Sequence, residues 1–112
     1  MQMEVTNLKR CDLLTLSGQI DSATAPALEA QLLELVESGK GKLVLDFGEV
    51  TFLSSAGLKA LLNAQIQIRK KSSHGRIALA DVPLHLKETL ELVGLHHIFD
   101  MYDNSTEAVG SF

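Results

Sequence analysis

Two neighbouring serines, Ser54 and Ser55, have the residue type and position that best suit a chemical modification. They follow an apolar segment and precede Ala56 and Gly57, where the sequence predicts that a helix begins. A serine at a helix start can cap the first turn by accepting a hydrogen bond from a backbone N–H group. Alternatively, one of the two hydroxyls accepts a phosphoryl group, which the unpaired N–H groups and the helix dipole would hold. Such a phosphoserine would add about −1.5 to −2 charges to an exposed surface.

Acidic residues stand at two places where a predicted strand leads toward a helix. Asp21 follows the strand that should end at Gly18, and Asp46 should end the strand 43–45. In open α/β sheets, functional groups gather outside the carboxyl ends of the parallel strands. If both connections are right-handed crossovers, Asp21 and Ser55 lie at the same edge of the sheet. They are then candidates for one shared surface.

The other residues that could do chemistry lack the partners that it requires. His96-His97 has neither a His-Glu-x-x-His arrangement nor a cysteine partner, so we predict no metal site. Ser55 is not within the Gly-x-Ser-x-Gly sequence expected of a hydrolase nucleophile. Cys11 has no evident activating neighbour, and we expect it to be a plain surface or edge residue. These patterns predict a protein that is not an enzyme and that has no cofactor.

The elements that must position these residues alternate between strands and helices. Their order, β-β-α-β-α-β-α-α, predicts an α/β fold with crossover connections. We expect a mixed, mostly parallel sheet of four to five strands flanked by three to four helices, with the first strand as an antiparallel edge. The expected strands lie near residues 3–6, 13–16, 43–45 and 77–80, and the expected helices near 26–38, 55–71, 83–93 and 105–109.

Apolar residues at helical spacing should turn toward the sheet. They are Leu28, Leu32, Leu35 and Val36 in the first helix, and Leu58, Leu61, Leu62 and Ile68 or Ile66 in the second, where Gln65 should also point inward. Val82, Leu86, Leu90 and Val93 mark the third helix. Gly39 stands where a helix C-terminus favours a positive φ. Val50, Phe52 and Leu53 should anchor in the core a loop that leads from Asp46 to the second helix.

Length and charge narrow the class of protein. The 112 residues suffice for a single domain, 1–112, with one hydrophobic core. A net charge of −4 argues against nucleic acid or an anionic membrane surface as the main partner. The single cysteine, with a start that does not resemble a signal peptide, predicts a cytoplasmic protein. Charged helix faces without an obvious exposed apolar patch predict a monomer.

Several motifs stand in order along the chain. The central motif is Asp46-Phe47-Gly48-x-Val50-x-Phe52-Leu53, followed by Ser54-Ser55-Ala56-Gly57-Leu58. Before it stand Ser17-Gly18-Gln19-Ile20-Asp21 and Ala25-Pro26-Ala27-Leu28, and after it Leu92-Val93-Gly94-Leu95, Ile98-Phe99 and Tyr102-Asp103. Each motif alone is weak, but their order covers nearly the whole chain without a large insertion. Together they resemble the STAS domain, whose best-known soluble members are bacterial anti-sigma factor antagonists.

The resemblance implies partner switching. The unphosphorylated antagonist binds an anti-sigma factor that is also a serine kinase, and so frees the sigma factor. The kinase phosphorylates a serine at the start of the second helix, and a serine phosphatase reverses this. By position the acceptor is Ser55, with Ser54 as the alternative. The implied partner-binding residues are Asp21, Ser22, Thr24, Asp46, Ser54, Ser55, Ala56, Gly57 and Lys59.

Two departures from the family pattern concern the acceptor. The commonest family motif is Asp-Ser-Ser/Thr-Gly, whereas here Ser54 replaces the acid and Ala56 replaces the second hydroxyl.

Two other functions stay open at this stage. One is a STAS accessory subunit of a membrane lipid-transport ATPase, and the other is a nucleotide-binding or weakly hydrolytic enzyme.

Overall fold

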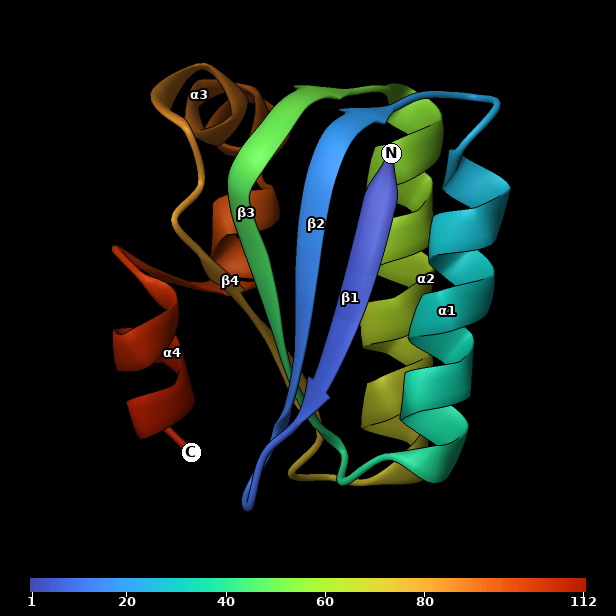
Figure 1. Cartoon of the computed structure of the whole chain (residues 1–112), viewed down its shortest axis with the longest axis vertical. Coiled ribbons are helices and arrows are strands. Elements are labelled where there is room, and N and C mark those ends of the chain that lie inside the picture. Colours follow the sequence, from blue (N-terminus) through green and yellow to red (C-terminus); the bar gives the residue numbers. More distant parts are fainter.

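A computed structural model describes all residues, 1–112, and confirms the α/β fold. Five strands form one sheet in the order β1-β2-β3-β4-β5, with β1 antiparallel to β2 and every other pair parallel (Figure 1). The elements are β1 (Gln2–Asn7), β2 (Asp12–Ile20), α1 (Ala25–Ser38), β3 (Lys42–Leu53), α2 (Ser55–Lys71), β4 (Arg76–Ala80), α3 (Leu84–Leu92), the 3₁₀ turn η1 (Leu95–His97), β5 (Asp100–Tyr102) and α4 (Ser105–Gly110). No helix is both long enough and apolar enough to cross a bilayer.

The third strand is much longer than the sequence predicted. Asp46 does not end β3, which continues for seven more residues to Leu53, so the expected loop before α2 is strand. β2 also runs past Gly18 to Ile20 and pairs with β3 as far as Ile20↔Leu53. Two register shifts in this pairing, one at Gly18 where φ is +87°, bend the strands together.

Two other local expectations were wrong. Phe52 does not anchor in the core, because its side chain is 48% exposed, whereas Val50 and Leu53 are buried as expected. Gly39 has a φ of −88°, not a positive one. Its role is steric, since a Cβ atom there would collide with the carbonyl oxygen of Leu35 and the carboxylate of Asp12.

The helices cover the two faces of the sheet unequally (Figure 1). α1 and α2 lie side by side on one face and enclose the main core, which contains the predicted inward residues Leu28, Leu32, Leu35, Val36, Leu61 and Ile68. α4 covers part of the opposite face, over a small second cluster formed by Cys11, Val44, Ala78, Ala80 and Ala108.

Cys11 is therefore fully buried, which corrects the expectation of a surface or edge residue. The sequence places it next to a turn, but α4 and the centre of the sheet enclose it. The pKa of the thiol is raised above its ordinary value of 9.0, mainly by burial and to a smaller extent by the negative charge of Asp12. The thiol consequently stays protonated and unreactive at neutral pH.

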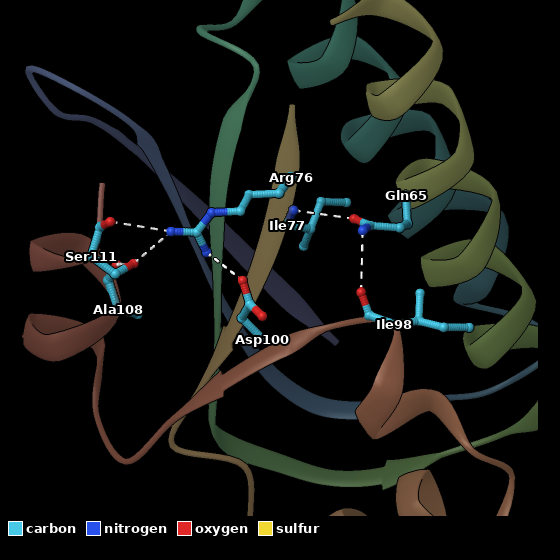
Figure 2. A network of polar contacts seen from close by, with 7 residues as sticks. All are labelled: Gln65, Arg76, Ile77, Ile98, Asp100, Ala108 and Ser111. Atoms are coloured by element: carbon cyan, nitrogen blue, oxygen red, sulfur yellow. Dashed lines mark hydrogen bonds and ion pairs between the residues drawn. The ribbon is translucent and has the colours of Figure 1, made fainter. Parts of the chain in front are cut away.

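Two polar side chains hold the C-terminal part of the chain in place (Figure 2). The buried amide of Gln65 on α2 accepts from Ile77 N (3.1 Å) and donates to Ile98 O (3.3 Å), so it links α2 to β4 and to the segment before β5. Arg76 pairs with Asp100 (Nη1–Oδ2, 2.8 Å) and donates to the carbonyl and hydroxyl of Ser111 (3.2 and 3.0 Å). The short strand β5, which the sequence did not predict, thus has side-chain as well as backbone support.

Candidate functional site

The start of α2 distinguishes the two serines. Ser54 is half-buried and caps the helix, since its hydroxyl oxygen accepts from Gly57 N at 3.2 Å. Ser55 is the first residue of the helix, and its exposed hydroxyl makes no hydrogen bond within the chain. The backbone N–H groups of Ser55 and Ala56 have no acceptor either, as expected in the first turn of a helix. This start of α2 therefore combines an accessible nucleophilic oxygen with unpaired donors.

The start of α1 is organised by Asp21. One oxygen of its carboxylate accepts from Ala23 N (3.0 Å) and Thr24 N (3.1 Å), and it lies 3.2 Å from the Thr24 hydroxyl. The hydroxyl of Thr24 also accepts from Asp21 N and reaches Gln19 O at 3.0 Å. These donors, Thr24 N first among them, lower the pKa of the Asp21 carboxyl below its ordinary value of 3.8. Asp21 and Thr24 thus hold the loop that precedes α1.

The two helix starts lie next to each other, as the crossover argument predicted. Ser54 N donates to Ile20 O at 2.8 Å, which joins the start of α2 to the end of β2. Gly57 makes this close approach possible, because a Cβ atom there would lie 2.6 Å from Leu53 Cδ1 and 2.7 Å from Ile20 Cγ2. A hollow of about 300 Å³ lies between the helices and is lined by Ser22, Ala25, Pro26, Glu29, Ala56, Lys59 and Ala60. The structure therefore places Ser22, Ala56 and Lys59 around one depression.

Asp46 is the exception among the proposed partner-binding residues. It lies inside β3, eight residues before Ser54, where it pairs with Thr15 and with Ala80. Its carboxylate accepts from Gly48 N at 2.9 Å. The structure does not bring it to the start of α2, because the strand that was expected to end at Asp46 continues.

An apolar surface that the sequence did not predict lies on the other side of Ser55. A second hollow, of about 280 Å³, is lined by Ser55, Leu58, Lys59, Leu62, Val93 and Leu95. Val93 is 55% exposed and the neighbouring Leu92 is 88% exposed, so the expectation of no exposed apolar patch was wrong. The signal was present in α2: Leu58, Leu62 and Ile66 form a second apolar stripe beside the one that meets the sheet.

No three His, Cys, Asp or Glu side chains are grouped as ligands of a metal ion would be. The rings of His96 and His97 are 3.9 Å apart at an angle of 40°, and both are exposed.

Comparisons with known proteins show the family to which the chain belongs. The model of the family described as "Mlab, STAS domain" matches residues 3–102. The chain belongs to the STAS domain family. It is 32% identical over 97 residues to the anti-sigma-F factor antagonist RsfB of Mycobacterium tuberculosis, covering 87% of this chain and 77% of RsfB.

Solved structures of STAS proteins share the fold. An anti-sigma factor antagonist from Mycobacterium paratuberculosis superposes with a TM-score of 0.86, at 27% identity over 98% of this chain and 92% of its own. Unphosphorylated SpoIIAA, also an anti-sigma factor antagonist, superposes with a TM-score of 0.84 over 98% of this chain and 95% of its own. Phosphorylated SpoIIAA, from Bacillus, superposes with a TM-score of 0.77 over 98% of each chain. At 17% and 16% identity, the two SpoIIAA structures establish the fold alone.

Proposed function

We propose that this STAS protein is an anti-sigma factor antagonist whose unphosphorylated form binds an anti-sigma factor that is a serine kinase, and that phosphorylation of Ser55 ends this binding. The observation that carries the proposal is the exposed, unpaired hydroxyl of Ser55 at a helix start with two unpaired N–H groups. The similarity to RsfB supports the class of partner.

The geometry favours Ser55 over Ser54 as the acceptor. The Ser54 oxygen is half-buried and already accepts from Gly57 N, so a phosphate on it would displace the helix cap. A phosphate on Ser55 would instead lie at the exposed end of the helix, where backbone N–H groups and the dipole favour an anion. Lys59, one turn further along the same side of α2, supplies a cation for it.

Phosphorylation should change binding far more than it changes folding. The added charge meets unpaired donors within the free protein, so the free energy of unfolding should shift little. In a complex the same charge must be desolvated against the partner, beside the neighbouring helix start that carries Asp21. A penalty of several kcal/mol weakens binding by orders of magnitude without any change in the backbone.

The test is affinity capture from the source cell with the wild-type protein, Ser55→Ala, Ser55→Asp and Ser54→Ala as the matched control. We expect the wild type, Ser55→Ala and Ser54→Ala to retain a serine kinase and Ser55→Asp to retain less of it. Incubation with that kinase and ATP, followed by peptide mass mapping, should place the phosphate on Ser55 in the wild type and in Ser54→Ala.

Three results would contradict the proposal. They are phosphate on Ser54, undiminished kinase binding by the Ser55 phosphoprotein, and capture of a permease and its ATPase in place of a kinase. The last result would instead support the transport-subunit function.

A further inference from the structure

An apolar groove extends from Ser55 along the outer side of α2. The hollow beside Ser55 continues into another of about 500 Å³, because Leu62 lines both. α2 supplies Leu58, Leu62 and Ile66 to one side, at positions i, i+4 and i+8. The segment from Val93 to Ile98, which contains η1, forms the other side. Ile66, Val93 and Ile98 are all exposed, so no element of this chain covers the groove.

The groove has the length of a four-turn helix. It reaches from Ser55 at the start of α2 to Arg69 near its end, which at 1.5 Å per residue is about 21 Å, or four helical turns. Its walls are a helix and a 3₁₀ turn, so it offers no free strand edge to which an extended peptide could add. Gln65 holds the second wall in place through its bond to Ile98 O (Figure 2).

The charge of the groove is opposite to that of the whole chain. Lys59 lines one end, and Arg69 and His97 line the other, while no lining residue carries a carboxylate. The ion pairs of the chain involve Lys40, Lys71 and Arg76, so Lys59 and Arg69 are both unpaired. A groove with cations at both ends, in a protein of net charge −4, complements an acidic ligand.

We infer that this groove binds an amphipathic helix of about four turns in the anti-sigma factor partner, with an apolar stripe and acidic residues toward its ends. This inference rests on the proposed function and names the partner's binding element. A second copy of this chain fits less well, because a two-fold contact would set its own Lys59 and Arg69 against cations of the first copy. Phosphate on Ser55 would lie at the mouth of the groove, pair with Lys59 and repel an acidic helix, which links the modification to release.

The inference can be tested without the natural partner. The probe is a synthetic peptide of about 15 residues with leucines at helical spacing i, i+4, i+7 and i+11 and glutamates elsewhere on its polar face. The matched control is the same peptide with lysine in place of every glutamate. Amide chemical shifts of the isotope-labelled protein are followed during titration with each peptide.

We expect the acidic peptide to shift amides along the groove and to bind at least about tenfold more tightly than the basic one. Leu62→Glu and the charge reversal Arg69→Glu, at an exposed position, should each reduce its affinity by about tenfold. Leu84→Glu, which replaces a leucine on α3 that is 71% exposed and does not line the groove, should leave the affinity unchanged.

Equal binding of the two peptides, shifts on another face, or no binding by either would overturn the inference. Concentration-dependent shifts of the groove amides without peptide would also overturn it, in favour of a second copy. Failure of the proposed function looks different, since the acidic peptide would still bind while cell extracts would yield no kinase.

Discussion

The starts of α1 and α2 are neighbours at one edge of the sheet, yet they satisfy their backbone donors in different ways. Before α1, the carboxylate of Asp21 accepts from two N–H groups, and the hydroxyl of Thr24 closes the same loop. Before α2, Ser54 accepts only from Gly57 N, and the N–H groups of Ser55 and Ala56 stay free. We call the start of α1 closed, because its donors are paired and Asp21 gives it a negative charge. We call the start of α2 open, because two of its donors are unpaired and no carboxylate caps it.

Because of this difference, a phosphate would be favoured at the start of α2 but not at the start of α1. A phosphate at the start of α1 would compete with Asp21 for its donors and would be repelled by the carboxylate. At the start of α2 the donors are available, and Lys59 lies one turn away. The carboxylate of Asp21 and a phosphate on Ser55 would therefore each have backbone donors of their own.

The largest effect on this arrangement should come from Gly57→Ala, which forces the two starts apart. The added Cβ would lie 2.6–2.7 Å from side-chain carbons of Leu53 and Ile20, and relief of this overpacking should cost about 1–3 kcal/mol of unfolding free energy. Denaturant unfolding measures the change. The control is Gly110→Ala, where a Cβ meets nothing within 4 Å. Equal stability of the two variants would show that the starts do not depend on this close packing.

A smaller effect is expected from Ser54→Ala, which removes the single side-chain cap of the open start. The loss of the bond from Gly57 N should lower the unfolding free energy by about 1 kcal/mol. Ser55→Ala should change it by less than about 0.5 kcal/mol, because the hydroxyl of Ser55 has no partner. Thermal unfolding of the two variants side by side checks this, and a larger loss in Ser55→Ala would reverse the roles assigned to the serines.

The smallest effect concerns the closed start and appears only in acid. The pKa of Asp21 is lower in the folded chain than its ordinary 3.8, so its carboxylate favours the folded state above that pH. This contribution is lost as the pH falls through the lowered pKa. The stability difference between wild type and Asp21→Asn should therefore shrink as the pH falls below 3.8.

Urea unfolding between neutral pH and strong acid measures that difference. Glu34→Gln, at an exposed position further along α1, is the control for a general loss of charge. A difference that stays constant over the whole range would mean that the donors of Ala23 and Thr24 do not act on the carboxylate.

The sequence alone determined the features that depend on residues close together in the chain. The bounds of α2 were predicted at both ends, since the expected range 55–71 is the observed one. The last helix was expected near residues 105–109, and it spans Ser105–Gly110 with Asn104 as its cap. The adjacency of Asp21 and Ser55 also followed from sequence, because a right-handed crossover fixes which edge of a parallel sheet a connection leaves.

The tertiary structure decided the features that depend on distant residues. β3 continues past Asp46 because β2 bends with it, and the three residues of β5 form a strand only because β4 lies beside them. Cys11 is buried because α4 folds over it from the far end of the chain. Two apolar stripes are visible in α2, but spacing cannot tell which one the sheet covers and which one stays open beside Ser55. Which stripe is buried depends on how α2 packs against the sheet, and residues from several distant strands determine that packing together.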